Sequence, residues 1–286
     1  MRHAALAALL ALPLLAPPAS ARIWRQDWSV GAHPTVRVET NDARIFIHDG
    51  APGQVTARVE YTVTVWGFHS TVREPMVSLD RQGDAIVVSA RSRANIAVFG
   101  GIVERFHIDL TVPPSCDIVA RGADGSIESG PVTGAIDLQT GDGHIAVHGL
   151  HGNVRLWTSD GGIDADSIDG ALLAHTGDGH LHVAGRFDAL DVHTGDGHVE
   201  ATVARGSVLQ QPWSLTTGDG GITLRIPRDL KALLDASAED GRLHVDLPIT
   251  LSGDVSHHEL RGELNGGTTP LRVRSGDGSI TLALSE

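Results

Sequence analysis

The chain has 286 residues, with 35 aspartates and glutamates against 22 lysines and arginines, which gives a formal net charge of -13. Such an acidic chain, with Lys231 as its one lysine, argues against binding to nucleic acid or to anionic lipid. Cys116 is the only cysteine, so an internal disulfide is excluded and stability must come from burial and backbone pairing.

Residues 1–21 have the pattern of a secretory signal peptide. Arg2 supplies the positive start, residues 4–15 form an apolar stretch, and residues 19–21 (ASA) are a small-x-small cleavage site. We therefore predict export to the periplasm, the cell surface or the medium. No cysteine follows the site, which argues against a lipid anchor. No later stretch is apolar enough to span a membrane, so no transmembrane segment is expected after cleavage.

Residues 22–114 predict an antiparallel β region that caps the rest of the chain. Apolar and polar residues alternate over long stretches joined by irregular links, which is typical of strands. A stack of strands needs such a cap because its open end would expose unpaired backbone groups. The joint to the next region is placed at Pro113 and Pro114. The stretches are 36–38, 45–47, 55–65, 86–89 and 106–112.

A short phrase repeats at constant spacing in residues 115–286. Thr-x-Asp-Gly occurs at 140–143, 158–161, 176–179 and 194–197, so its aspartates recur at equal intervals. Alternating apolar residues flank each copy, and Asp-Gly between such runs indicates a tight turn. No segment after the signal shows sustained helical periodicity. The sequence therefore predicts an all-β fold, a β-solenoid of about 18-residue rungs with an antiparallel N-terminal cap.

The same period predicts the core. Apolar residues at equivalent positions should form inward ladders about 4.8 Å apart. The repeat loosens after residue 205, where an insertion at 206–213 lengthens one interval. Residues 252–267 predict a polar loop or an irregular hairpin, and residues 280–284 a last strand. One predicted ladder is Ile145, Ile163, Leu181 and Val199; the other is Ile136, Val154, Leu172 and Leu190.

Several short segments resemble one exported bacterial family of β-strand repeats, regarded as candidate adhesins and related to auto-transporter head domains. The segments are LTVPP at 110–114, IVA at 118–120, DGSI at 124–127 and LRVRSGDGSI at 271–280, together with the Thr-x-Asp-Gly units. The resemblance covers residues 30–284. It implies a β-solenoid-like fold, export and no established enzyme activity, and it assigns no functional residue.

The stacked aspartates are the first candidate site. Neighbouring carboxylates about 5 Å apart repel each other by on the order of 1 kcal/mol in water. Each aspartate could bond the backbone N–H groups of its own turn, or a divalent cation such as Ca²⁺ could bridge adjacent rungs. The turn interpretation is the simpler one. The residues concerned are Asp142, Asp160, Asp178 and Asp196.

Histidines are the second candidate, because several of the 16 share repeat positions. His144, His180 and His198 follow the turn glycine, where imidazoles beside carboxylates could bind Zn²⁺, Cu²⁺ or Ni²⁺. His182 lies two residues after His180 and makes the best local pair. Duplication of a solvated residue explains the same pattern. We predict at most weak surface binding of a divalent cation by the four aspartates with His180 and His198, and no other cofactor.

No catalytic residue is predicted. Gly-x-Ser-x-Gly is absent, and His258 and Glu259 are followed by Gly262 where a zinc protease needs its second histidine. Asp137, Asp164 and Asp191 lie on predicted strands and could line a groove like that of polysaccharide-degrading enzymes. They also fit the polar half of the alternation. Only Trp157 and Trp213 could supply an aromatic cleft in the repeat region.

The sequence therefore favours an exported, non-enzymatic protein of the cell envelope that presents a repetitive surface for adhesion or for binding an envelope protein or polysaccharide. One alternative is a carbohydrate-active β-helix enzyme, which elaborate loops around an aromatic cleft would favour. The other is a periplasmic metal-binding protein, which a compact set of histidine and carboxylate ligands would favour.

Overall fold

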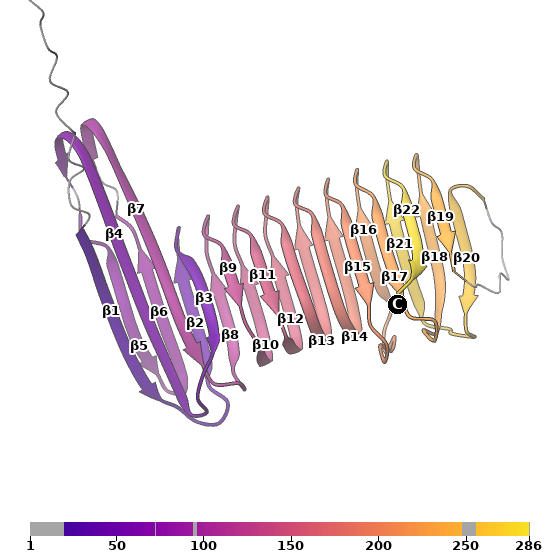
Figure 1. Cartoon of the computed structure of the whole chain (residues 1–286), viewed down its shortest axis with the longest axis horizontal. Helices are drawn as coiled ribbons and strands as arrows, with labels where there is room; N and C mark the ends of the chain where they lie inside the picture. Colours follow the sequence, from indigo (N-terminus) through magenta and orange to yellow (C-terminus); the bar gives the residue numbers. More distant parts are fainter. Residues whose placement is uncertain (1–19, 72, 94–95, 248–255, 286) are drawn as a thin grey trace, which may run out of the picture.

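The computed structural model describes residues 20–71, 73–93, 96–247 and 256–285, and within these ranges it contains strands and no helix. Helices long and apolar enough to cross a membrane are therefore absent from the described residues. The predicted signal peptide lies almost wholly outside those residues. Figure 1 shows an elongated stack of strands, with the N-terminal third at one end.

The N-terminal strands are β1 (Ser20–Ser29), β2 (Thr35–Thr40), β3 (Arg44–Asp49), β4 (Gln54–Thr71), β5 (Met76–Gln82), β6 (Ala85–Arg91) and β7 (Ile96–Val112). The next are β8 (Asp117–Arg121), β9 (Ile127–Ser129), β10 (Val132–Gln139), β11 (Ile145–His148), β12 (Leu150–Trp157), β13 (Ile163–Thr176), β14 (Leu181–Thr194) and β15 (Val199–Val203). The last are β16 (Trp213–Thr217), β17 (Ile222–Ile226), β18 (Ala232–Ala238), β19 (Leu243–Asp246), β20 (Glu259–Leu264), β21 (Pro270–Ser275) and β22 (Ile280–Leu284).

The strands lie in two facing rows that enclose one core. The first row runs β5-β6-β2-β8-β10-β12-β13-β14-β16-β21-β18-β20. The second row runs β1-β4-β7-β3-β9-β11-β13-β14-β15-β17-β22-β19. β13 and β14 are long enough to contribute to both rows. The chain is therefore an all-β solenoid, as the sequence predicts.

Both predicted core ladders are confirmed. Ile145 pairs in parallel with Ile163, Ile163 with Leu181 and Leu181 with Val199, in each case one repeat further along the chain. Ile136, Val154, Leu172 and Leu190 pair in the same way in the first row. All eight side chains are at most 2% exposed. Strand alternation places the neighbours of these residues on the outer faces.

The order of strands in space departs from the order along the chain at both ends. β2 and β3 precede the predicted boundary at residue 114, yet they stack between β6 and β7 on one side and β8 and β9 on the other. β21 and β22 come last in the chain but lie between β16 and β17 and the pair β18 and β19. The last two strands of the chain, and β2 and β3 near its start, are thus enclosed by segments from the chain interior, whereas β1 lies at the edge of the second row.

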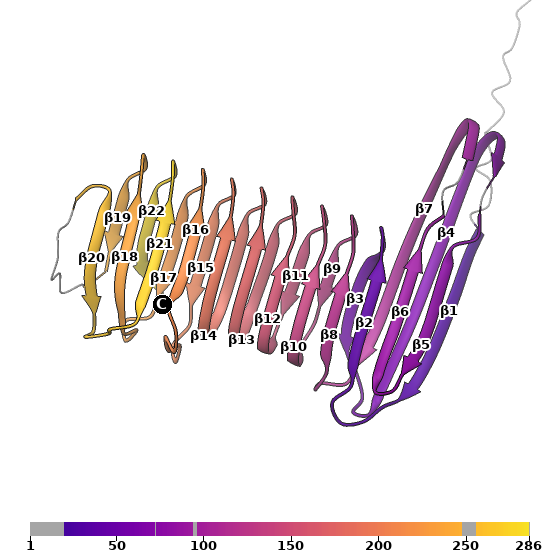
Figure 2. The same cartoon turned by 180° about the vertical axis from the view of Figure 1, so that it is seen from behind.

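Antiparallel strands stand beyond these inserted pairs. At the N-terminal end β4 pairs with β7 and with β1, and β5 pairs with β6. Figure 2 shows β1, β4 and β7 as longer strands inclined to the rest of the stack. At the other end β20 pairs antiparallel with β18, so a strand lies inside the segment 252–267 predicted as a loop or irregular hairpin. Residues 248–255 lie outside the described part of the chain.

The core assignment predicts unequal effects of two adjacent substitutions. Leu181→Ala should lower the free energy of unfolding by about 2 to 5 kcal/mol, because it leaves a cavity in the inward ladder. His182→Ala changes an outward side chain and should lower it by less than about 1 kcal/mol. Urea unfolding followed by circular dichroism measures both. Equal losses at the two positions would show that the inward and outward assignment is wrong.

Candidate functional site

Threonine hydroxyls connect each Thr-x-Asp-Gly corner to the corner before it. The Thr158 side chain is fully buried, and its Oγ1 lies 2.7 Å from the carbonyl oxygen of Gly141 and 3.0 Å from that of Gly143, to which it donates. The same oxygen accepts a bond from the Gly161 N–H at 3.2 Å. Thr140, Thr176, Thr194 and Thr217 make equivalent bonds to the preceding corner.

Backbone contacts at the corners are close enough to require glycine. A Cβ added to Gly161 would overlap the carbonyl group of Gly143, and one added to Gly179 would overlap that of Gly161. The N–H groups of Ser159 and Asp160 both donate to the carbonyl oxygen of Gly141, at 2.7 and 3.3 Å. The corners therefore continue the hydrogen-bonded ladder of the strands around the bend.

The aspartate side chains do not make the turn bonds that the sequence suggested. Asp142, Asp160, Asp178 and Asp196 are exposed, and within the part of the chain that the structure describes their carboxylates make no hydrogen bond. The threonine hydroxyl instead accepts from the N–H of the glycine that follows Asp160, Asp178 and Asp196. Charge repulsion is nevertheless present along this edge, because burial and then the nearby Asp124 and Glu104 carboxylates raise the pKa of Asp42.

Histidines near the corners pair with carboxylates on neighbouring strands. His144 Nε2 lies 3.1 Å from Asp164 Oδ2, and His182 Nδ1 lies 3.6 Å from Glu200 Oε2. The sequence paired His182 with His180, whereas in the structure His182 pairs with Glu200. Among the described residues no group of three or more His, Cys, Asp or Glu side chains could hold a metal ion. Weak cation binding by the six predicted residues stays a prediction.

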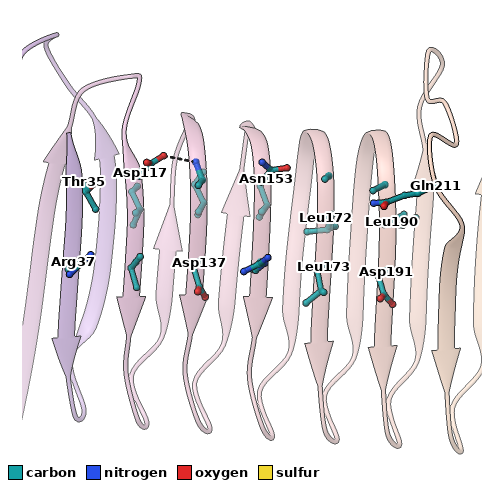
Figure 3. Close-up of a pocket in the computed structure, with 18 of the residues that line it drawn as sticks. Thr35, Arg37, Asp117, Asp137, Asn153, Leu172, Leu173, Leu190, Asp191 and Gln211 are labelled. Atoms are coloured by element: carbon teal, nitrogen blue, oxygen red, sulfur yellow. Dashed lines mark hydrogen bonds between the residues drawn. The ribbon is translucent and has the colours of Figure 1, made fainter. Parts of the chain in front are cut away.

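The outer face of the first row carries a long open groove, which we call the trough (Figure 3). Its volume is about 870 Å³. Its floor is made of short outward side chains on successive strands, so the larger side chains on either side stand above it. Five steps of about 4.8 Å between strands give it a length of about 24 Å. The floor residues are Thr35, Asp117, Ala135, Asn153, Ala171 and Ala189.

One wall of the trough alternates in charge. This wall is the column of residues that follow the floor residues by two positions on each strand. In it Asp137 pairs with Arg155, Arg155 with Leu173, and Leu173 with Asp191. Arg37 on β2 continues this column, and Figure 3 shows Arg37, Asp137, Leu173 and Asp191 at a common height across the strands. Val119 on β8 lies between Arg37 and Asp137, so the wall combines two positive, two negative and two apolar side chains, and its net charge is close to zero.

An aromatic strip lies beside that wall, two residues further along the strands. The Trp157 and His175 rings stack with centroids 6.5 Å apart and an interplanar angle of 14°, and the His175 and His193 centroids are 4.7 Å apart. Trp157 and Leu173 are each 42% exposed. Partial burial, and then the neighbouring His193, lower the pKa of His175, so this ring is neutral at neutral pH.

Trp213, the other tryptophan of the repeat region, does not reach this surface. It is fully buried against Phe187 with its ring edge-on, at a centroid distance of 6.3 Å. Its Nε1 donates to the carbonyl oxygen of Asp188 at 3.4 Å. Residue type alone does not show which of the two tryptophans is buried. Strand alternation does place Trp157 on the outer face, because it follows the buried Leu156.

The insertion between β15 and β16 forms a lip at one end of the trough. Gly206 has a φ of 84°, a conformation that favours glycine. Ser207 Oγ accepts from the Phe187 N–H at 3.0 Å and donates to the Ala204 carbonyl at 2.8 Å. These bonds hold the loop against β14, and Gln211 from the loop lines the trough (Figure 3). The lip therefore adds the amide side chain of Gln211 to a surface that is otherwise built from strands alone.

The three aspartates that suggested a carbohydrate-active enzyme do not share one groove. Asp164 lies on the second-row part of β13, paired with Ala146 and His182. Asp137 and Asp191 are both in the trough but three strand steps apart, about 14 Å. Glycosidase carboxylates are roughly 5 to 9.5 Å apart. Asp117 lies on the strand next to that of Asp137 and is nearer to it than Asp191 is. A bond from the Ala135 N–H, and more weakly one from His33, lower the pKa of Asp117, which suits a structural carboxylate rather than a general acid.

The fold and this surface define a β-solenoid with an open row of outward side chains rather than an enclosed cavity. The chain belongs to the Toastrack DUF4097 family, whose model matches residues 36–283. No curated protein matches it. Family membership confirms the resemblance noted in the sequence, whereas the relation to auto-transporter head domains stays a prediction.

Several crystal structures are similar to the chain at low identity. A candidate adhesin from Parabacteroides merdae ATCC 43184 is 12% identical, with a TM-score of 0.48, over 91% of this chain and 96% of that one. A candidate adhesin from Bacteroides fragilis NCTC 9343 is 13% identical, with a TM-score of 0.46, over 92% and 97%. A candidate lipid-binding protein from Parabacteroides distasonis ATCC 8503 is 11% identical, with a TM-score of 0.43, over 91% and 96%.

The corner geometry predicts a specific role for the threonine hydroxyl. Thr176→Val keeps the shape of the side chain but leaves the Gly161 carbonyl and the Gly179 N–H without their partner. The free energy of unfolding should fall by about 1 to 3 kcal/mol. Thr176→Ser keeps the hydroxyl and should lose less. Urea midpoints at an unchanged slope measure the difference, and a valine variant as stable as the parent would refute the role.

The aspartate edge predicts at most a small effect of cations on stability. Millimolar Ca²⁺ or micromolar Zn²⁺, compared with chelator, should shift the melting temperature only slightly, because an exposed edge without a compact ligand set binds weakly. Asp160→Asn with Asp178→Asn should remove whatever shift occurs. A shift of more than a few degrees that this double variant abolishes would instead make metal binding a main property of the protein.

Proposed function

We propose that this protein is a non-enzymatic binding protein of the cell envelope that holds a partner or polymer in the trough on the first row. The trough is the observation that carries the proposal. It crosses six strands, is open along its length and ends at the lip formed by the insertion. Such a shape fits an extended ligand better than a small molecule, which usually occupies a concave, mostly enclosed site.

The composition of the trough supports recognition rather than chemistry. Exposed tryptophan, arginine and leucine are next to short polar residues, and aromatic and arginine side chains dominate the energetics of many binding surfaces. The spacing of Asp137 and Asp191 and the position of Asp164 on the other row remove the arrangement that favoured a carbohydrate-active enzyme. The metal-binding alternative has no three-ligand group in the described residues to support it.

The remaining parts of the proposal concern architecture and location. We treat the interval between successive corner aspartates, about 18 residues, as the repeating unit of the stack. We treat the antiparallel strands β1, β4 and β5 as the cap of the N-terminal end. Pairing with β4 along the whole length of β1 supports a covering role there. The predicted signal sequence at residues 1–21 supports export. An exported binding protein would display the trough to envelope components.

The test is to block the trough with a long side chain and to compare the effect on binding with that of the same substitution on the second row. Ala171→Arg places a long side chain on the trough floor, whereas Ala146→Arg places it on the outer face of the second row. Both positions are partly exposed alanines on strands, so both variants should fold, which circular dichroism checks.

Binding is measured by biolayer interferometry against the separated polysaccharide and protein fractions of the envelope. Ala171→Arg should reduce the binding signal at least about tenfold, since a desolvated pocket contact is worth more than about 1 kcal/mol. Ala146→Arg should leave it unchanged. Equal retention of binding by the two variants would contradict the use of the trough.

A further inference from the structure

We propose that the ligand of the trough is a linear, uncharged polysaccharide that packs its sugar rings against Leu173 in the wall of the trough and against Trp157 in the aromatic strip beside that wall. This inference rests on the proposed function, because it names the ligand class of the same site. Three observations lead to it: the pairing on both sides of the strands beneath the trough, the charge balance of the wall, and the composition of the aromatic strip.

The strands beneath the trough offer no free sheet edge. β8, β10, β12, β13 and β14 each pair with a strand on both sides. An extended peptide binds to a sheet chiefly by adding a strand at an edge, and in the first row the edges are β5 and β20. A peptide lying across the middle of the row would leave its own N–H and C=O groups mostly unpaired. The trough therefore disfavours a polypeptide.

The charges along the wall disfavour a charged polymer. Arg37 and Arg155 are balanced by Asp137 and Asp191, which lie in the same column. Asp117 on the floor adds one more carboxylate, which the Ala135 N–H and His33 already bond. A polyanion would meet both aspartates and the net charge of -13 of the whole chain. A polycation would meet the two arginines. An uncharged chain meets alternating donors and acceptors without repulsion at any step, which is the electrostatic complement of this wall.

The aromatic strip supplies the apolar part of the contact. Trp157 in the strip and Leu173 in the wall lie on adjacent strands and are both 42% exposed, so their apolar surfaces face solvent together. Sugar rings have an apolar C–H face and hydroxyl groups at the edge. An indole buries the first, while the guanidinium of Arg155 and the carboxylate of Asp137 can bond the second.

The groups around Trp157 are polar, and the ring that stacks on it is uncharged. The pKa of His175 is lowered, so the ring beside Trp157 is neutral near pH 7. Asn153 on the floor and Gln211 on the lip add amide groups that donate and accept. The trough thus offers one apolar platform and polar groups of both kinds along about 24 Å, which is the pattern a chain of neutral sugar units requires.

The experiment is calorimetric titration with purified linear oligosaccharides of glucose, mannose and N-acetylglucosamine, with alginate as the polyanion and a neutral extended peptide for comparison. At least one uncharged oligosaccharide should bind with a Kd below about 1 mM. Trp157→Ala should weaken this binding at least about tenfold, and Trp157→Phe should retain most of it because an aromatic face remains.

Leu233→Ala is the matched control. Leu233 is also an exposed apolar residue of the first row, 40% exposed, but it lies on β18, beyond β16 and β21 and away from both the trough and the aromatic strip, so this change should leave the Kd unaltered. Thermal melting of all variants verifies the fold. Equal affinity of Trp157→Ala and the parent for the sugar would overturn the anchor role.

Two further outcomes separate this inference from the proposed function. Failure of every neutral oligosaccharide, while Ala171→Arg still abolishes binding of an envelope protein or of alginate, would overturn the ligand class and leave the binding function standing. An effect of Ala171→Arg on no ligand at all would overturn both.

Discussion

The whole structure depends on the close approach of consecutive corners. Parallel strands can continue from one rung to the next only if the bend between the two rows also stacks at ladder spacing. At that spacing a Cβ on Gly161 would overlap the backbone of Gly143, so glycine is required there. The buried hydroxyl of Thr158 joins the two corners by hydrogen bonds. Without this join the two rows would not share one register.

The common register also produces the trough that we propose as the binding surface. Because strands pair residue for residue, outward side chains form columns, and a column of short residues next to columns of long ones is a groove. Ala135, Ala171 and Ala189 make such a column, and Arg155 and Trp157 stand beside it in the next two. The trough needs no dedicated loops apart from the lip, because it arises from the size of residues at repeat positions.

Periodicity made much of this predictable. The constant spacing of the corner motif and the alternation of apolar residues predicted both inward ladders, from Ile145 and from Ile136, because these depend on local sequence alone. The positions of β2, β3, β21 and β22 were not predictable, since pairing between distant segments leaves no spacing signal. The corner bonds are made by the buried threonine rather than the exposed aspartate, and the sequence motif alone does not show which of the two side chains points inward. The trough was missed because it depends on the sizes of residues that the alternation identifies only as polar.

Strands β2, β3, β21 and β22 are inserted within the stack, so the number of rungs can change without changing the strands that close its two ends. In an ordinary solenoid the first and last rungs of the chain are the exposed ones, so any change in repeat number alters a terminus. Here β2 and β3 at one end and β21 and β22 at the other are each enclosed by neighbours. Units between β8 and β15 can therefore be duplicated or lost without disturbing either closure. Evolution can lengthen the surface in steps of one strand while both ends keep their contacts.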